Sequence, residues 1–233
     1  MRILAFDTAT PVASVAVGID GALAAEISIT GDKIQMERLM PMIDAALREA
    51  GVTVRDLDGI AIGVGPGLFT ALRIGVTTAN TLSQVLRVPV VGFSSLDILA
   101  AGMAYRKGLI AAAIDARRGE VFTALYRAAG GTAKTIVTER VIDPIVLADE
   151  LAAYDEPITM VGDGFSVYCS VMRDRLENRV VLASPEFMYP RASSLLMLAE
   201  SSLQAAPRDV PAMVAPVYIR QPDAVELIKK MKQ

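Results

Sequence analysis

Runs of apolar residues separated by turn residues divide the first fifty positions of the chain into three short strands and a helix. Residues 3–6, 13–17 and 23–29 are mostly apolar, and this pattern predicts a three-strand meander. Over residues 37–50 the apolar positions recur at helical spacing, which predicts an amphipathic helix. The chain therefore opens with a meander that leads into a helix.

A buried strand, a glycine-rich turn and a second helix follow. The continuous apolar run at 59–64 is typical of a fully buried parallel strand, and the spacing over 70–86 predicts a helix. Another short apolar run predicts a buried strand at 88–91. Between the first strand and the helix stands Gly65-Pro66-Gly67, and many α/β proteins bind phosphate at such a turn.

The second half of the chain repeats this order. Its pattern predicts strands at 109–114, 121–126, near 135–138 and at 158–161, with a helix around 147–153. The repeat indicates that one supersecondary unit occurs twice.

Polar residues also recur at equivalent places in the two halves. Asp115 follows the first strand of the second half as Asp7 follows the first strand of the chain, and Gly162-Asp163-Gly164 takes the place of Gly65-Pro66-Gly67. The separation of roughly 100 residues indicates an internal duplication. We expect an α/β protein with two lobes around a cleft. This arrangement resembles the duplicated fold of actin, hexokinase and Hsp70 (the ASKHA group, RNase H-like), and the resemblance implies a cleft lined by phosphate-binding turns of both lobes.

We expect the boundary between the lobes near the short polar segment 104–108. Residues 1–104 would then form the N-terminal lobe and residues 105–233 the C-terminal lobe. Whether the C-terminal helix packs back on the N-terminal lobe is left open.

Composition narrows the classes of function. The chain has 233 residues, of which 53% are hydrophobic, enough for a full globular core. A formal net charge of -3 argues against an autonomous nucleic-acid binder. Cys169 is the single cysteine, and no apolar run has the length of a signal-sequence core or a membrane span. We therefore expect a cytoplasmic protein without a membrane partner.

Several motifs resemble those of the TsaB family, also called YeaZ, which takes part in making threonylcarbamoyladenosine at position 37 of tRNA. The similarity runs almost from end to end of the chain. Its motifs are Phe6-Asp7-Thr8-Ala9-Thr10, Glu37-Arg38-Leu39-Met40-Pro41-Met42-Ile43, Gly65-Pro66-Gly67-Leu68-Phe69-Thr70-Ala71-Leu72-Arg73-Ile74-Gly75, Ser94-Ser95-Leu96, Asp115-Ala116-Arg117-Arg118-Gly119-Glu120-Val121-Phe122, Gly162-Asp163-Gly164 and Pro216-Val217-Tyr218-Ile219-Arg220. Where the family usually carries His-Ser, this chain has Gln35-Met36, and the effect of that change is left open.

The resemblance implies a non-catalytic subunit that binds the transferase TsaD and supports it together with the ATPase TsaE. TsaD resembles this chain in fold and holds its catalytic metal through a His-x-x-x-His pair. Alignment on Pro89 places Ser95 and Leu99 at those two positions, and neither side chain is a useful metal ligand. The resemblance thus implies no catalytic residue and no metal, with tRNA bound only as part of the complex. It leaves open a homodimer of the isolated chain and weak ATP or ADP binding at a subunit boundary.

Two interpretations remain open for the glycine turns and the neighbouring aspartates. They form either a vestigial nucleotide or anion site, because glycine lets a ligand approach backbone N–H groups, or ordinary tight turns and polar caps. No lysine of the Gly-Lys-Ser/Thr kind follows the first turn. The residues concerned are Asp7, Thr8, Gly65, Pro66, Gly67, Asp115, Gly162, Asp163 and Gly164.

An apolar stripe on the first long helix predicts either a core contact or a partner contact. Methionine is flexible and is frequent on surfaces that accept a partner. The resemblance implies that TsaB pairs with TsaD through this helix and the next one, which favours the partner contact. The predicted partner face consists of Met36, Leu39, Met40, Ile43, Leu47, Ile74, Thr77 and Thr78.

Two other functions stay open as alternatives. One is a weak ASKHA-type ATPase or nucleotide-binding protein that uses Asp7 and the two glycine turns. The other, a peptidase, is disfavoured because the chain contains no histidine that could activate Ser94, Ser95 or Cys169 or bind zinc.

Overall fold

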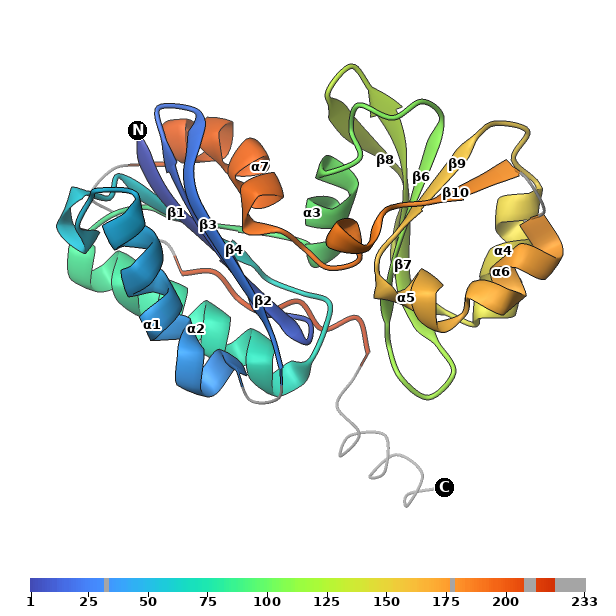
Figure 1. The fold of residues 1–233 in the computed structure, drawn as a ribbon, viewed down its shortest axis with the longest axis horizontal. Helices are drawn as coiled ribbons and strands as arrows, with labels where there is room; N and C mark the ends of the chain where they lie inside the picture. The colour runs from blue at the N-terminus through green and yellow to red at the C-terminus, as the bar shows by residue number, and fades with distance from the viewer. Residues whose placement is uncertain (32–33, 177–178, 208–212, 221–233) are drawn as a thin grey trace.

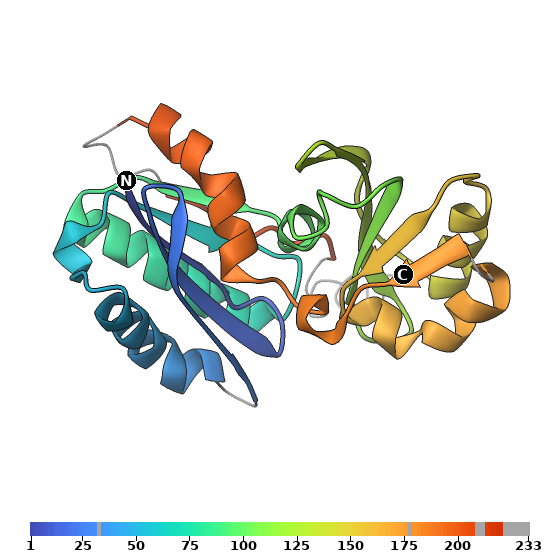
Figure 2. The same cartoon turned by 45° about the horizontal axis from the view of Figure 1, so that its top comes forward.

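The structure, a computed structural model, describes residues 1–31, 34–176, 179–207 and 213–220. For residues 34–36 it describes the backbone alone. Two five-stranded sheets lie side by side, and helices cover them (Figures 1 and 2). We call the first sheet with its covering helices the N-terminal lobe and the second the C-terminal lobe.

The first sheet has the strand order β3-β2-β1-β4-β5. Strand β1 is antiparallel to β2 and parallel to β4, and β4 is parallel to β5. The strands are β1 (Arg2–Asp7), β2 (Val12–Ile19), β3 (Ala22–Thr30), β4 (Gly59–Gly63) and β5 (Val90–Phe93).

The second sheet has the order β10-β9-β6-β7-β8, which is the same order when β6 to β10 are counted as β1 to β5. The identical topology confirms the duplication predicted from the sequence. One predicted strand was too short, because β8 extends well beyond 135–138. The strands are β6 (Leu109–Asp115), β7 (Val121–Ala129), β8 (Thr132–Ile142), β9 (Ile158–Val161) and β10 (Val180–Leu182).

Helices pack on both faces of the first sheet, and the predicted ones start earlier than expected. The predicted helix 37–50 begins at Ile34, so Pro41 lies inside it. The helices are α1 (Ile34–Glu49), α2 (Phe69–Leu86), α3 (Ser95–Ala101), α4 (Pro144–Ala152), α5 (Asp163–Val167), α6 (Cys169–Leu176) and α7 (Ala192–Ala205), with short 3-10 turns η1 (Val54–Asp56) and η3 (Pro185–Phe187).

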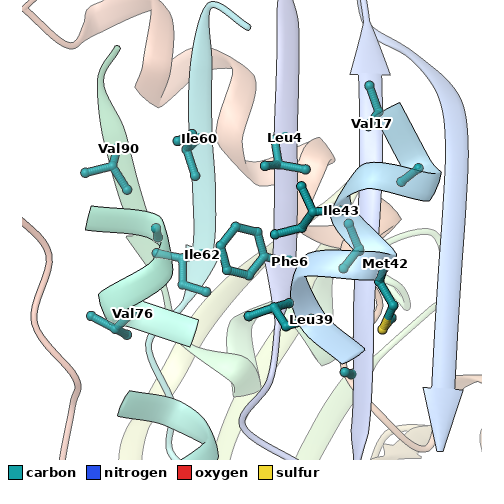
Figure 3. Close-up of a cluster of buried hydrophobic side chains, with 14 of the residues drawn as sticks. Leu4, Phe6, Val17, Leu39, Met42, Ile43, Ile60, Ile62, Val76 and Val90 are labelled. Atoms are coloured by element: carbon teal, nitrogen blue, oxygen red, sulfur yellow. The ribbon is translucent and has the colours of Figure 1, made fainter. Parts of the chain in front are cut away.

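Alternate residues of β1 point to the two faces of the first sheet. Leu4 and Phe6 belong to the core under α1 and α2, which Figure 3 shows in close-up. Ile3 and Ala5 belong to the core under α7 on the other face. The period of two along a strand therefore divides one short segment between two separate cores.

Small residues on the sheet let α7 lie close to it. A Cβ added at Gly59 would lie 2.9 Å from a methyl carbon of Leu203, and one added at Gly18 would lie 3.1 Å from a methyl carbon of Leu196. Leu195 in the first turn of α7 is fully buried. The last described helix thus packs on the N-terminal sheet, although its sequence follows the whole C-terminal sheet (Figure 1).

Helix α3 carries the chain from the first sheet to the second and is buried in both cores. Ile98 packs with the residues under α7, whereas Leu96 and Leu99 pack with residues of the second sheet. Its Asp97 also accepts a hydrogen bond of 2.8 Å from the hydroxyl of Tyr126 on β7. The connection between the lobes is therefore a packed helix.

Within the described part of the chain, no helix has both the length and the apolar character needed to cross a bilayer. Residues 221–233, which end the predicted C-terminal lobe, lie outside the described residues.

We expect Leu195→Ala to destabilise the protein by about 2–5 kcal/mol, because it leaves a cavity between α7 and the first sheet. Met197→Ala on the same helix is the control, since 54% of this side chain is exposed, and it should change stability by less than about 0.5 kcal/mol. Urea unfolding followed by circular dichroism measures both. Equal effects of the two variants would contradict the assignment of α7 to this core.

Candidate functional site

The glycine turn of the N-terminal lobe is pressed against the loop that follows β1. A Cβ added at Gly67 would lie 2.0 Å from the carbonyl oxygen of Ala9. The backbone N–H of Leu68 donates a hydrogen bond of 2.7 Å to that same oxygen. Glycine is needed here because two backbone segments touch, which is a structural reason independent of any ligand.

Asp7 at the end of β1 is completely buried and its oxygens are occupied by groups of the protein. Its Oδ2 accepts a hydrogen bond of 2.7 Å from Ser95 Oγ, and its Oδ1 accepts one of 2.9 Å from the backbone N–H of Ala9. A Cβ added at Gly63 would lie 1.8 Å from Oδ2, so glycine leaves room for the carboxylate. Burial raises the pKa of Asp7 to about 6, although both hydrogen bonds act in the opposite direction.

The neighbouring Thr8 is also turned inward. It is fully buried, and its Oγ1 donates a hydrogen bond of 2.8 Å to the carbonyl of Ala71 in the first turn of α2. Asp7 and Thr8 therefore fix the β1 loop against α2 and α3.

The second glycine turn repeats this geometry in the C-terminal lobe. A Cβ at Gly162 would lie 2.0 Å from the carbonyl oxygen of Ala113 on β6. Asp163 Oδ1 accepts a hydrogen bond of 3.1 Å from the N–H of Asp115. Burial raises the pKa of Asp163, and the charge of Asp115 adds to the effect. Asp115 pairs with Arg117 at 3.2 Å.

A cavity of about 350 Å³ lies between the two lobes. Of the nine predicted site residues it brings together Pro66, Gly67 and Asp115, while the other six do not line it. The remaining lining residues are Leu68, Phe69, Ala116, Arg117, Phe122, Val217, Tyr218, Ile219 and Arg220.

The described lining of this cavity offers few ligands for a nucleotide-bound metal. Its walls offer aromatic rings, two arginines and one carboxylate, whereas Asp7 is shielded from it by its own hydrogen bonds. Among the residues that the structure describes, no three His, Cys, Asp or Glu side chains are grouped as ligands for a metal.

The predicted partner face was wrong for three residues of α1. Leu39, Ile43 and Leu47 are buried, and Figure 3 shows Leu39 and Ile43 beside Phe6 under α1. The stripe wraps around more of the helix than one exposed face, so these side chains belong to the core of the lobe. Met40 is exposed over 52% of its surface.

The remaining residues of the predicted partner face differ in their exposure to solvent. On α2, Thr77 is exposed, while Ile74 and Thr78 are half-buried. The side chain of Met36 lies outside the described residues. The exposed part of the face is therefore centred on Met40 and Thr77.

Sequence reasoning named Ser95 as a replacement for a metal ligand and as a disfavoured nucleophile, but it missed the contact of Ser95 with Asp7. It also missed the contacts of Arg73, Tyr218 and Arg220, although all three residues stand in recognised motifs. Their polar contacts cross between segments more than 80 residues apart, and no local pattern reports such contacts.

Comparison with known proteins shows similarity over almost the whole chain. The family model TsaD, tRNA N6-adenosine threonylcarbamoyltransferase, matches residues 32–227. The tRNA threonylcarbamoyladenosine biosynthesis protein TsaB of Bacillus subtilis (strain 168) is 33% identical over 227 residues, which cover 96% of each chain. TsaB of Escherichia coli (strain K12) is 32% identical, over 94% of this chain and 95% of that protein. The chain belongs to the TsaB (YeaZ) family.

Solved structures agree with this membership in the TsaB family. YeaZ from Pseudomonas aeruginosa superposes with a TM-score of 0.78 at 31% identity and covers 93% of this chain and 99% of that one. A more distant match is component A of (R)-2-hydroxyglutaryl-CoA dehydratase from Acidaminococcus fermentans, with 12% identity and a TM-score of 0.54. The match covers 88% of this chain and 99% of that chain, and it shows similarity of fold only. The fold is the duplicated actin-like fold predicted from the sequence.

The raised pKa of Asp7 predicts a pH dependence of stability. Because the folded-state pKa is about 6 and the unfolded value is 3.8, the folded state binds more protons between these values. The stabilising contribution is complete below pH 4 and is lost as the pH rises through 6. At ~1.4 kcal/mol per pKa unit, about 3 kcal/mol is involved.

Asp7→Asn removes this titration, so the stability of the parent relative to the variant should fall by about 3 kcal/mol between pH 4 and pH 7. Urea unfolding at several pH values measures the difference, and the carboxyl resonance of Asp7 by NMR reports the pKa directly. A carboxyl group that titrates near 4 would contradict the complete burial of Asp7 as the cause of its raised pKa.

Proposed function

We propose that this chain is the non-catalytic subunit of the tRNA N6-threonylcarbamoyladenosine (position 37) transferase complex, where it binds TsaD and supports it together with TsaE. The observation that supports the proposal most is the full-length similarity to TsaB proteins combined with the state of Ser95. The serine stands where the resemblance to TsaD aligns a metal-binding histidine, and its hydroxyl is committed to buried Asp7. The chain thus keeps the fold that it shares with TsaD, whereas serine replaces a metal-binding histidine.

The surface for TsaD is proposed on the outer side of α1 and α2. These two helices pack against each other over the same face of the first sheet. Met40 and Thr77 are exposed there, and a helix-on-helix interface of ordinary size built around them would bury ~1,600 Å² in total. In the free subunit the same surface is available for a homodimer. We expect a tRNA-modifying assembly of this kind to act in the cytoplasm.

A weak nucleotide-binding protein is the second candidate. The cavity of about 350 Å³ between the lobes favours it, because its volume lies at the lower end of small-ligand sites. Against it stand the shielding of Asp7 and the lack of a lysine after the first glycine turn. A peptidase is the weakest candidate, since Ser95 is buried and the chain has no histidine to activate a nucleophile.

Met40→Asp should weaken TsaD binding by about thirtyfold or more. The change puts a carboxylate without a partner at the centre of the proposed surface, where anchors commonly contribute ~2 kcal/mol or more. That loss corresponds to thirtyfold at ~1.4 kcal/mol per factor of ten. Calorimetry with TsaD from the same organism measures the affinity, and a threonylcarbamoyl transfer assay with and without this chain measures its support.

Met197→Asp is the matched control, because Met197 is exposed to nearly the same extent, 54% against 52%, but lies on α7 at the opposite face of the sheet. It should leave TsaD binding unchanged. Two results would count against the proposal: unchanged binding by a normally melting Met40→Asp variant, or unfolding of that variant, which would assign Met40 to the core.

The isolated chain should bind ATP weakly, with a Kd of about 0.1 mM or higher, or roughly -5.5 kcal/mol at best. The physical reason is that Asp7, the carboxylate that follows the first strand, is enclosed by Ser95 and Ala9 and does not line the cavity, where Asp115 is the one carboxylate among the described lining residues. Calorimetric titration with Mg-ATP tests this. A micromolar Kd would instead favour the nucleotide-binding candidate.

A further inference from the structure

Residues 213–220 form an extended segment that touches both lobes, and we call it the strap. In Figure 1 it is the red segment that runs along the N-terminal lobe towards the C-terminal lobe. It contains no regular helix or strand, so its position depends on the contacts of its side chains and backbone with the two lobes.

The first half of the strap is attached to the N-terminal lobe. The amide of Asn80 on α2 holds Val214 from both sides, since Asn80 Nδ2 donates to the Val214 carbonyl at 2.9 Å and Asn80 Oδ1 accepts from its N–H at 3.0 Å. Asn80 is only 9% exposed. The N–H of Val217 then donates to the carbonyl of Val64, the residue directly after β4, at 2.8 Å.

Tyr218 continues this attachment beside the glycine turn. Its ring lies 5.2 Å from the ring of Phe69, and its hydroxyl accepts a hydrogen bond of 2.9 Å from Arg73 Nε. The guanidinium of Arg73 in turn lies 3.9 Å from the ring centre of Phe69. The three side chains form one stack at the beginning of α2.

The end of the strap is attached to the C-terminal lobe. Arg220 Nη1 donates a hydrogen bond of 2.7 Å to the carbonyl of Ala116, and its Nη2 forms an ion pair with Glu120. Its guanidinium also lies 5.7 Å from the ring centre of Phe122. Ile219 packs against the core cluster of the second sheet. Arg220 is the better buried partner of the ion pair, at 19% exposure against 42% for Glu120.

These attachments lie on either side of the cavity between the lobes. Residues 217–220 of the strap line it together with the first glycine turn and with residues 115–117 of the C-terminal lobe. Any motion that widens the cavity must therefore break the contacts of Arg220 or pull residues 214–217 from α2 and β4.

We propose that the strap locks the two lobes at a fixed spacing across the cavity, with Arg220 as its attachment to the C-terminal lobe. Nucleotide-driven enzymes with two lobes open and close around their ligand. In this chain a covalently connected segment lines the cavity beside the first glycine turn. The chain then acts as one rigid body, and this property is independent of which partner it binds.

The lock can be tested by measuring the distance between the lobes. The single native cysteine, Cys169, is exposed on α6 of the C-terminal lobe and provides the first spin-label site. Arg55→Cys, at an exposed position of the N-terminal lobe, provides the second. No native cysteine has to be removed. In the otherwise unchanged full-length chain, pulsed electron spin resonance should give a single narrow distance distribution. Arg220→Ala should broaden it and add longer distances.

Arg127→Ala is the matched control, because Arg127 also pairs with a glutamate, Glu156, but both residues belong to the C-terminal lobe. It should leave the distribution narrow. Glu120→Ala removes the ion pair alone, so it should broaden the distribution less than Arg220→Ala, which also removes the contacts with Ala116 and Phe122. The double variant should add little to Arg220→Ala.

Hydrogen exchange of the Val217 amide provides a second measurement that needs no label. Loss of the charge-assisted contacts of Arg220 should raise its exchange rate by about tenfold or more, while Arg127→Ala should leave it unchanged. The proposal is overturned if the labelled parent already shows a broad distribution. It is also overturned if Arg220→Ala and Glu120→Ala fold normally and leave both the distance distribution and the exchange rate as in the parent.

Discussion

The buried hydrogen bond between Ser95 Oγ and Asp7 Oδ2 is the contact on which the centre of the molecule depends. It joins the end of the first strand to the first residue of α3, the helix that carries the chain into the second sheet. A buried carboxylate needs such donors, because the loss of water around it raises its pKa and its free energy. A position that could serve chemistry in a related fold therefore serves to hold the link between the lobes.

Burial decides which part of the first helix can meet another protein. The apolar residues of α1 lie on two sides of the helix, and Leu39, Ile43 and Leu47 pack in the core against the first sheet. What remains outside is the narrower strip around Met40. The consequence is that a partner contact on this side must combine α1 with the adjoining surface of α2, since α1 alone offers too little apolar area for a stable interface.

Much of the fold follows from local pattern. The meanders, the buried strands after them and their repetition were predictable, because alternation, continuous apolar runs and glycine turns are local signals. The site was less predictable. Asp7 and Asp115 look equivalent in sequence, yet only Asp7 meets a serine 88 residues away, and only Asp115 lines the cavity. Residues 216–220 of the strap form a recognisable motif, but the position of the strap depends on partners such as Asn80, 134 residues from Val214, and no local signal connects the two.

Helix α3 and the strap restrain the lobes by different physical means. Rotation about α3 would separate Leu96 and Leu99 from one core or Ile98 from the other, and exposed apolar area costs about 25 cal/mol per Å². The strap adds directional contacts, which resist separation but contribute little once a guanidinium or amide is displaced into water. A packed helix alone would still allow small pivoting within its contacts. Together with a strap bound to both lobes, it leaves the duplicated fold without the free hinge that a cleft enzyme requires.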